Sequence, residues 1–278
     1  MSSTQGNYYL KKFHHKIFVI KIGGEVVASK KLLENLLLDV KTLVDSEIKI
    51  ILVHGGGTQA DTLSKQLGFK PQKIQGRRVT KEEDLEVIKM LYGGTLNLEI
   101  LSIVKKIGMN GIRVSGLDGN LLEVSLRDKI FFDYGYVGDI TAVNSDILHL
   151  LINSQYLPVV SPLAATDDGV ILNINADTIA ASIAADLKAE KLILFTSLDG
   201  IYDGTRLIST LTIDEANRLL DKNIVTDGMA VKVQTSIQAL KNAVKSVHIL
   251  NGLSPHSLLK EILTRDGIGT MILPSLSS

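Results

Sequence analysis

Apolar residues follow two alternating patterns along this chain. Short runs of β-branched and aliphatic residues are typical of buried strands, and they occupy residues 16–24, 48–53, 111–115, 157–161, 170–173, 191–195, 247–250 and 269–273. Between them apolar residues return every three or four positions. This spacing predicts amphipathic helices over residues 29–46, 59–67, 80–106, 144–153, 177–187, 213–222, 226–244 and 256–263. Strands and helices that alternate in this way predict an α/β fold.

Two stretches depart from this alternation. Residues 70–79 contain a proline and a glycine and are too short for a helix, so we expect a hairpin there. Near its end, Arg77 and Arg78 are either solvated surface charges or a clamp for a carboxylate. Residues 121–137 are rich in β formers and predict one or two edge hairpins. Thr80 is expected to be the N-cap of the long helix that follows, in a capping-box pattern.

The first strand ends in a lysine and a glycine pair, Lys21, Gly23 and Gly24. Such an ending has the layout of an anion site, because glycines let the backbone come close and lysine supplies a charge. A glycine pair after a strand is, however, more often only a tight turn. The second strand ends in the glycine run 55–57, and a right-handed βαβ unit brings both loops to one edge of a parallel sheet. The two loops together favour an anion-binding site.

Polar residues in the second half also follow apolar strands. A helix N-cap explains either Asn175 or Asp177, but it does not explain Asn173 inside an apolar strand. The polar loop 196–203 follows a fully apolar strand, at the end where α/β sheets bind ligands. Lys232 lies one turn into a predicted helix, where a lysine is usually a solvated surface residue.

Composition excludes several classes of function. The 278 residues carry no net charge, so no basic field recruits nucleic acid or anionic lipid. The chain has no cysteine, which excludes disulfides and cysteine-ligated metal and fits a reducing cytoplasm. The N-terminus lacks the apolar core of a signal peptide, and no apolar run reaches the roughly 18 residues of a membrane span. No His, Asp or Glu cluster has metal-ligand spacing, so no metal site is expected. We therefore expect a soluble, cytoplasmic protein without a membrane or nucleic-acid partner.

Six segments, in order, resemble the motifs of the amino acid kinase family: 21–24, 53–57, 76–80, 173–177, 196–200 and 227–233. The resemblance runs from residue 16 to 272, and within the family it is strongest to the enzymes that phosphorylate the γ-carboxylate of N-acetyl-L-glutamate, the second step of arginine biosynthesis. It implies a three-layer αβα sandwich with a mainly parallel central sheet. It also implies a single domain, 1–278, whose N-terminal half (about 16–165) binds the acyl amino acid and whose C-terminal half (about 166–278) binds ATP.

The resemblance also assigns roles to individual residues. Lys21 and Lys232 resemble the catalytic lysines that neutralise the phosphoryl group in flight, and Asp177 resembles the carboxylate that holds both. The implied substrate contacts are Gly24, Gly56, Gly57, Arg78 and Asn173. The implied ATP contacts are Ser197, Leu198, Asp199, Gly200, Ile201, Tyr202, Thr226 and Met229. Magnesium is expected to arrive with ATP and to be held mainly by the phosphates.

These roles agree with the physical chemistry of phosphoryl transfer. A γ-carboxylate is already ionised at neutral pH, so transfer between two anions needs positive charge and positioning more than a base. Two lysines and glycine amides supply that stabilisation. A carboxylate between the lysines keeps both of them protonated.

The ends of the chain resemble one branch of the family more than the others. Residues 255–264 and 267–272 resemble the branch that binds arginine as a feedback inhibitor, with Leu263 in place of a usual phenylalanine. Residues 8–13 resemble the end of the N-terminal helix that joins dimers of that branch into hexamers. The resemblance therefore implies arginine as an inhibitor and a homo-oligomer, either a homodimer or a hexamer built as a trimer of dimers. Ser197 departs from the family pattern, because relatives often carry an aspartate there.

The residues leave other functions open. A related kinase would act on N-succinyl-glutamate or on an aminoadipate derivative of lysine biosynthesis. A catalytically inactive amino-acid sensor would keep the fold, although both lysines and the aspartate are present here. A dehydrogenase is disfavoured, because no G-x-G-x-x-G follows the first strand.

Overall fold

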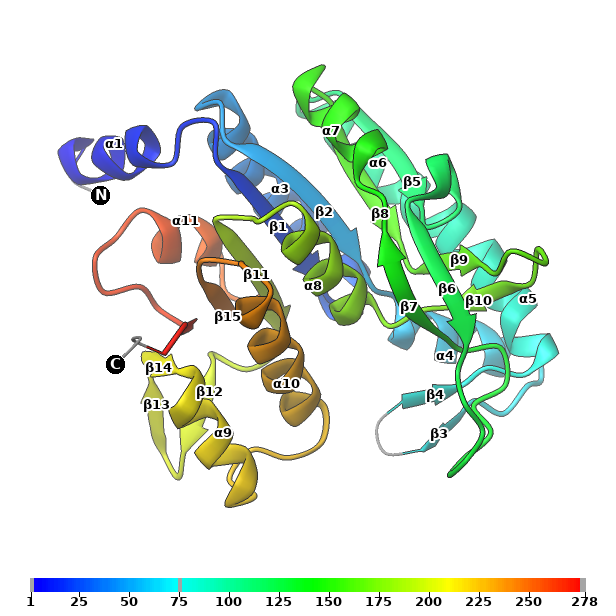
Figure 1. Cartoon of the computed structure of the whole chain (residues 1–278). Coiled ribbons are helices and arrows are strands. Elements are labelled where there is room, and N and C mark those ends of the chain that lie inside the picture. The colour runs from blue at the N-terminus through cyan, green and yellow to red at the C-terminus, as the bar shows by residue number, and fades with distance from the viewer. Residues whose placement is uncertain (1–2, 75–76, 276–278) are drawn as a thin grey trace.

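The structure is a computed structural model that describes residues 3–74 and 77–275. Its centre is an eight-stranded sheet (Figure 1). In spatial order the strands are β14 (Thr210–Thr212), β16 (Thr270–Leu273), β15 (Val247–Asn251), β11 (Lys191–Thr196), β1 (Ile17–Ile22), β2 (Lys49–His54), β8 (Leu157–Ser161) and β5 (Gly111–Ser115). Neighbouring strands from β15 to β5 are parallel, and β16 pairs antiparallel with β15. The predicted α/β fold with a mainly parallel sheet is confirmed.

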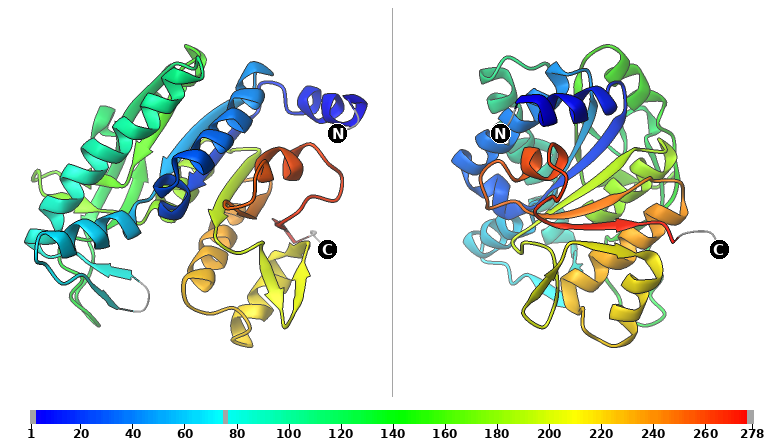
Figure 2. Two further views of the ribbon diagram at one scale, coloured as in Figure 1. Left: turned by 180° about the vertical axis from the view of Figure 1, so that it is seen from behind. Right: turned by 90° about the vertical axis from the view of Figure 1, so that its left-hand side faces the viewer.

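Helices cover both faces of this sheet and complete a three-layer sandwich. The α-helices of the described residues are α1 (Ser3–Lys12), which projects beyond the sandwich (Figure 1 and Figure 2), and α2 (Gly24–Ala28), α3 (Lys30–Asp45), α4 (Gly57–Gln66), α5 (Glu82–Met90), α6 (Leu96–Lys106), α7 (Asp146–Asn153), α8 (Ala176–Asp186), α9 (Ile213–Asp221), α10 (Asp227–Lys241) and α11 (Ser257–Ile262). In Figure 1, α8 and α10 lie in front of the sheet, and the view from behind brings α3 and α6 forward (Figure 2).

Alternation along the strands explains why both faces are covered. Phe18 and Ile20 point into the core shared with α3, α6 and α11, whereas Val19 between them points into the core shared with α7, α8 and α10. All three side chains are fully buried. A strand that is apolar at every position needs a packed layer on each side, which is what the continuous apolar runs of the sequence require.

Four antiparallel strand pairs stand outside the main sheet. They are β3 (Gln72–Ile74) with β4 (Arg77–Val79), β6 (Leu122–Leu126) with β7 (Gly138–Val143), β9 (Leu163–Ala165) with β10 (Ile171–Asn173), and β12 (Ile201–Asp203) with β13 (Arg206–Ile208). The hairpin expected at 70–79 is confirmed. Of the hairpins expected over 121–137 only the first strand, β6, lies in that range, because its partner β7 begins at Gly138 after a long connecting loop. Gly76, at the start of one predicted motif, lies outside the described residues.

The predicted N-cap at Thr80 is wrong. Helix α5 begins at Glu82, its N-cap is Lys81, and the backbone N–H of Lys81 donates to Asp84 Oδ2 at 3.3 Å. Thr80 is instead held by the following loop, because its backbone N–H donates to the Tyr134 carbonyl at 2.9 Å. Thr80 is buried, and its hydroxyl accepts a hydrogen bond from the side-chain amide of Asn173 at 3.0 Å.

The long helix expected over 80–106 is interrupted by a π-helical turn at Leu91–Thr95, which contains Gly93 and Gly94. By length and composition alone, the stretch Glu82–Lys106 is long and apolar enough to cross a membrane, which the sequence analysis did not expect. Half of its most apolar window is buried, and Leu96 and Ile100 belong to the core beside α3. Packing of this kind is typical of a core helix.

Candidate active site

A carboxylate held between two lysines lies at the carboxyl edge of the sheet. Lys21 lies near the carboxyl end of β1, Asp177 lies in the first turn of α8, and Lys232 projects from α10. Lys21 Nζ lies 2.9 Å from Asp177 Oδ1, and Lys232 Nζ donates to Asp177 Oδ2 at 2.6 Å. We call these three residues the two-lysine cluster. Residues separated by more than 200 positions in the sequence thus meet in one place.

The electrostatics of the two-lysine cluster favour its charged form. Burial alone would raise the pKa of Asp177, but the ammonium groups of Lys21 and Lys232 outweigh it and hold that pKa well below its usual range. Burial lowers the pKa of Lys232, while the charge of Asp177 acts in the opposite direction. With Asp177 ionised, two ammonium groups face one carboxylate, so the cluster holds one positive charge in excess.

The two glycine loops pack closely against their neighbours beside this cluster. The Gly24 carbonyl accepts from Gln59 Nε2 at 2.6 Å, and a Cβ on Gly24 would come within 2.6 Å of Gln59 Oε1. A Cβ on Gly56 would approach Leu96 Cδ1 to 2.4 Å. Only glycine fits at these two positions without displacing a neighbour. Helix α4 begins at Gly57, so the positive end of its dipole points toward the same edge.

A cavity of about 250 Å³ opens on one side of the two-lysine cluster. Five basic side chains line it: Lys21, Lys73, Arg77, Arg78 and Arg127. Among the described residues of the lining, Asp177 is the only carboxylate. A lining of this charge is suited to an anion with more than one carboxylate.

Arg78 and Asn173 are both held in place at this first cavity. One terminal nitrogen of Arg78, Nη2, donates to the Gly57 carbonyl at 2.8 Å and pairs with Asp61. The other, Nη1, is buried and has no hydrogen-bond partner among the described residues. The side-chain amide of Asn173 donates to the Thr80 hydroxyl at 3.0 Å. An unpaired buried guanidinium N–H is costly unless a ligand completes it, so Arg78 is prepared for an acceptor.

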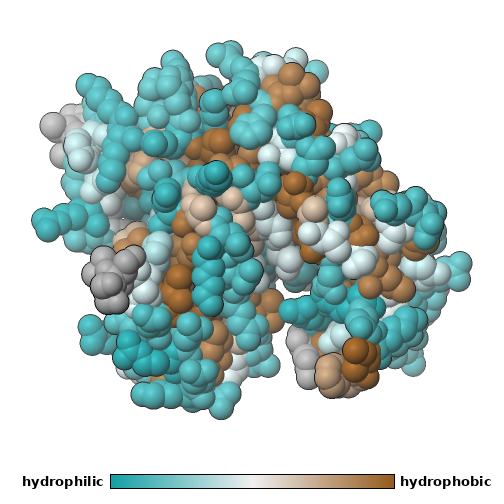
Figure 3. Space-filling view, in the orientation of Figure 1, coloured by the Kyte–Doolittle hydropathy of each residue, from teal (hydrophilic) through white to brown (hydrophobic). Residues whose placement is uncertain are grey.

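A second cavity, of about 260 Å³, opens on the other side of the two-lysine cluster. Its lining includes Phe195, Thr196, Ser197 and Lys232 from the C-terminal half of the chain. It shares four lining residues with the first cavity: Lys21, Gly24, Gly57 and Lys73. The two cavities therefore meet beside Lys21, and Figure 3 shows the molecule hollowed between the lobe with β3 and β4 and the lobe with α9 and α10.

Residues predicted to contact ATP take several different positions. Ser197 lines the second cavity, Leu198 is half-exposed, and Met229 and Tyr202 are partly buried. Asp199 accepts from Asn251 Nδ2 at 2.8 Å and from the Tyr202 hydroxyl at 3.1 Å.

Ile201 and Gly200 shape the loop between β11 and β12 from within. The Ile201 side chain is fully buried, and its backbone N–H donates to Thr270 Oγ1 at 2.8 Å. A Cβ on Gly200 would lie 2.5 Å from the same oxygen. Thr226 is the N-cap of α10. The structure thus brings Ser197 to the cavity, while Ile201 and Gly200 fix the loop that carries it.

Several residues of the site gave no signal in the sequence. Lys73 and Arg127 come from the hairpins, where they pair with Asp61 at 2.8 Å and with Asp139 at 3.0 Å. Tyr92 also lines the first cavity, and burial raises its pKa to about 12. Only the hairpin folds could reveal these contacts, because each basic side chain reaches the cavity from an otherwise ordinary polar stretch.

A larger groove, of about 820 Å³, runs between β7, α8 and α10. Its lining is open and mixed, and Arg77, which also lines the first cavity, is its only described member among the residues considered for the site. The candidate site is the pair of smaller cavities, because within residues 3–74 and 77–275 the buried charges and the glycine loops converge there.

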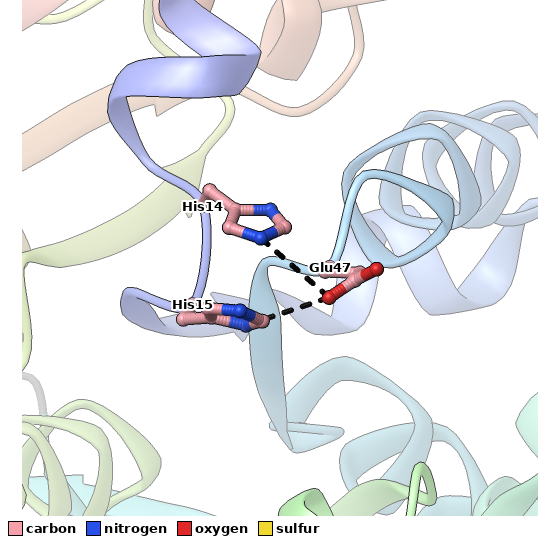
Figure 4. Close-up of side chains that lie close together, drawn as sticks. All are labelled: His14, His15 and Glu47. Carbon is pink, nitrogen blue, oxygen red and sulfur yellow. Dashed lines mark ion pairs between the residues drawn. The ribbon is translucent and has the colours of Figure 1, made fainter.

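Three side chains of metal-ligating type lie close together, a grouping that their spacing in the sequence did not predict. Among the described residues, the ligand atoms of His14, His15 and Glu47 lie within 4.8 Å of one another (Figure 4). The sequence could not show this, because two turns far apart in the chain bring the side chains together. The cluster lies at the amino ends of the strands, away from both cavities.

Comparison with known proteins gives a consistent result. A family model described as "Amino acid kinase family" matches residues 16–251. The chain is 40% identical to an acetylglutamate kinase of Kosmotoga olearia over 95% of this chain and 93% of that one. It is 39% identical to an acetylglutamate kinase of Methanocaldococcus jannaschii, over 95% of this chain and 92% of that one.

Solved structures share the fold. An N-acetylglutamate synthase from Neisseria gonorrhoeae, complexed with coenzyme A and N-acetyl-glutamate, superposes with a TM-score of 0.89 at 27% identity. The match covers 97% of this chain and 62% of that one, so this chain spans less than two thirds of the synthase. A carbamate kinase from Giardia superposes with a TM-score of 0.67 at 14% identity, over 94% of this chain and 99% of that one.

Proposed function

The chain belongs to the amino acid kinase family, and from this premise we propose that it transfers the γ-phosphoryl group of ATP to the γ-carboxylate of N-acetyl-L-glutamate, a step of arginine biosynthesis. It is a phosphotransferase with a carboxyl group as acceptor. The acetylglutamate kinases that it resembles at 37–40% identity, nearly end to end, support this acceptor.

The observation that carries the proposal is the meeting of two cavities beside the two-lysine cluster. The acyl amino acid would lie in the first cavity, with a carboxylate on the free N–H of Arg78 and near Asn173. The phosphates of ATP would lie in the second, beside Ser197 and Lys232. The phosphoryl group in transfer would then pass Lys21, which lines both cavities.

This geometry suits a reaction between two anions. The attacking γ-carboxylate is already ionised at neutral pH, so no residue has to remove a proton. The excess positive charge of the two-lysine cluster and the positive end of α4 stabilise the charge that spreads over the phosphoryl oxygens. Asp177 contacts both ammonium groups and holds them in position before the substrates bind.

Magnesium is expected to accompany ATP. In the part of the chain that the structure describes, Glu25 is the only carboxylate that lines the second cavity, which fits an ion bound through one or two carboxylates plus the phosphates. When bound, magnesium neutralises part of the phosphate charge. Glu25 would share in holding it, while the two lysines act on the phosphoryl group itself.

An assay of ADP release with a panel of acceptors tests the proposal. We expect turnover with N-acetyl-L-glutamate to exceed that with N-succinyl-glutamate or an N-acyl aminoadipate. Faster turnover with one of the other acceptors would keep the chemistry but change the substrate. No ADP release with any acceptor would favour a catalytically inactive sensor.

We also propose the division of labour between the two halves. Residues 16–165 supply β1, β2, β5 and β8 and all five basic residues of the first cavity, and residues 166–278 supply β11 and Lys232. Residues 16–165 would hold the acyl amino acid and residues 166–278 would hold ATP.

The protein is proposed to be cytoplasmic. It is also proposed to be homo-oligomeric, as a dimer or as a hexamer joined through α1. Light scattering of the full chain and of a chain lacking residues 1–12 would test the oligomeric state.

Arginine is proposed as an inhibitor. An N-acetylglutamate synthase from Neisseria gonorrhoeae, 26% identical over 97% of this chain, was solved in complex with coenzyme A and L-arginine. Residues 8–13 and 255–264, which resemble the arginine-binding branch, are linked in this structure through Lys191. The Lys191 ammonium lies over the Phe13 ring and contacts His248, and His248 in turn contacts Glu261 of α11. Kinase activity that does not respond to millimolar arginine would remove this proposal without affecting the kinase assignment.

A further inference from the structure

Three metal-ligating side chains gather at the amino ends of β1 and β2, at the opposite end of the sheet from the candidate active site. His14 and His15 lie between α1 and β1, and Glu47 lies between α3 and β2 (Figure 4). His14 Nε2 and His15 Nδ1 each lie 3.6 Å from Glu47 Oε2. We propose that His14, His15 and Glu47 form a binding site for a divalent transition-metal ion of the Zn²⁺ type.

The spacing of the ligand atoms leaves room for such an ion. Zinc binds imidazole nitrogen and carboxylate oxygen at about 2.1 Å, so two of its ligands in a tetrahedral site lie about 3.4 Å apart. The observed 3.6 Å between each imidazole nitrogen and Glu47 Oε2 is close to that value. It is also longer than a direct hydrogen bond, so the two contacts that Figure 4 marks are ion pairs only when the imidazoles are protonated, and neutral imidazoles leave the space between the three groups to an ion.

The backbone at this site adopts conformations that disfavour the residues present. His15 and Glu47 both have φ of +61°, in the left-handed region where glycine is preferred. Glu47 follows α3 in a left-handed cap, with its backbone N–H donating to the Val44 carbonyl at 2.8 Å. The side chains of His15 and Glu47 are 61% and 62% exposed, so core packing does not explain them. Both strained positions nevertheless carry metal-ligating side chains.

Local hydrogen bonds hold the two turns and orient one ligand. The His15 backbone N–H donates to the Glu47 carbonyl at 3.0 Å and joins the turns directly. His14 Nδ1 lies 3.4 Å from the Ser46 carbonyl, so an N–H at this position donates to it and leaves the Nε2 lone pair toward Glu47. Metal-binding histidines typically donate a hydrogen bond from the ring nitrogen that does not bind the metal, and this contact is of that kind.

The ligand set indicates the class of ion. Two imidazoles and one carboxylate suit zinc and neighbouring transition metals, whereas magnesium prefers oxygen ligands. The magnesium that accompanies ATP would therefore not compete here. Because all three side chains are exposed, water can complete the coordination. The bound ion would tie the turn after α1 to the end of α3.

Calorimetric titration of the full chain with zinc chloride, without nucleotide, tests the site. We expect one Zn²⁺ per chain, no competition from equimolar magnesium, and affinity at least about tenfold weaker in His15→Ala and in Glu47→Gln. His149→Ala is the matched control, because His149 is exposed and lies outside the cluster, and it should bind as the wild type does.

Glu47→Gly separates a metal ligand from an ordinary turn residue. Glycine relieves the left-handed backbone and removes the carboxylate, so the metal-free thermal midpoint should rise while zinc affinity falls. The proposal is overturned if the wild type binds no zinc, if the cluster variants bind as the wild type does, or if one ion binds per two chains with zinc-dependent association in light scattering.

Discussion

Two buried charge clusters of this molecule each contain lysine and a carboxylate, but they differ in charge balance and in access to a cavity. The two-lysine cluster lies between two cavities at the carboxyl edge of the sheet. The second cluster consists of Lys191, His248 and Glu261. Lys191 Nζ lies 2.9 Å from His248 Nε2, and His248 Nδ1 lies 2.7 Å from Glu261 Oε1. The other oxygen of Glu261 accepts the backbone N–H groups of Ile268 at 2.7 Å and Gly269 at 3.0 Å.

The two clusters differ in charge balance and in access. The two-lysine cluster has two cations on one carboxylate and opens onto space that an anion can fill. In the second cluster His248 lies between one lysine and one carboxylate, and backbone amides occupy the other oxygen of that carboxylate. Burial lowers the pKa of Lys191 to about 8, so even that positive charge is weakly held. Excess buried charge beside a cavity is suited to ligand binding, whereas balanced and closed charge is suited to holding segments together.

Removing either lysine of the two-lysine cluster should have the largest effect. In Lys21→Ala or Lys232→Ala we expect kcat/KM to fall on the order of a thousandfold, about 4 kcal/mol, because charge stabilisation in the transition state is lost. Steady-state kinetics and circular dichroism measure activity and folding. Lys245→Ala, at an exposed position, is the control and should be unaffected. Wild-type activity in Lys232→Ala would remove the role assigned to that residue.

Neutralising the carboxylate of each cluster should distinguish the two directly. Asp177→Asn leaves two buried ammonium groups without a partner, and we expect the free energy of unfolding to fall by about 3 kcal/mol. An anion such as ATP should restore part of this loss, because it replaces the missing charge. Glu261→Gln should also destabilise the fold, but ATP should restore no more in it than in the wild type. Urea unfolding with and without ATP measures both, and equal rescue of the two variants would contradict the comparison.

Arg78→Lys should weaken binding of the acceptor more than it slows the reaction. Lysine cannot keep the bond to the Gly57 carbonyl and also present a second fixed N–H to a carboxylate. We expect the KM for the acyl amino acid to rise about thirtyfold, roughly 2 kcal/mol, with a smaller change in kcat. An unchanged KM would place the acceptor elsewhere. Arg113→Lys is a suitable control, because Arg113 lines neither cavity.

Much of the fold could be predicted because the long elements have strong periodicity. The strands β1, β2 and β11 each contain a run of four consecutive apolar residues, and α3 and α9 repeat apolar residues at helical spacing. The three-residue strands β9, β12 and β13 are too short to show a period, whereas β10 lies in the apolar run predicted as a strand. Thr80 was wrongly predicted as a cap because the residue types from Thr80 to Glu83 fit a capping box. In the structure the backbone N–H of Thr80 instead donates to the Tyr134 carbonyl, a contact with a distant segment that the local pattern does not show.

The site was predicted through ordered motifs, and its remaining parts depend on tertiary structure. The motifs gave Lys21, Asp177 and Lys232, which the structure brings together, and their catalytic roles stay predictions. Lys73 and Arg127 reach the first cavity from hairpins whose exact paths the sequence does not fix. The metal-ligand cluster depends on two left-handed turns at non-glycine residues, a conformation that residue type argues against.

The pH dependence of the second cluster should give the smallest effect. The pKa of Lys191 is lowered from 10.5 to about 8 in the folded chain, chiefly by burial. Between pH 8 and pH 10.5 Lys191 is protonated in the unfolded chain but largely deprotonated in the folded chain. The free energy of unfolding therefore rises with pH in this window, and this gain disappears as the pH falls back to about 8. Relative to Lys191→Met, which has no such group, the wild type should gain on the order of 1 kcal/mol between pH 8 and pH 9. Urea unfolding of both proteins at the two pH values measures this gain. If the free energies of unfolding of the two proteins change with pH in parallel, Lys191 stays protonated over this range. The two clusters would then not differ in how firmly their lysines hold a proton.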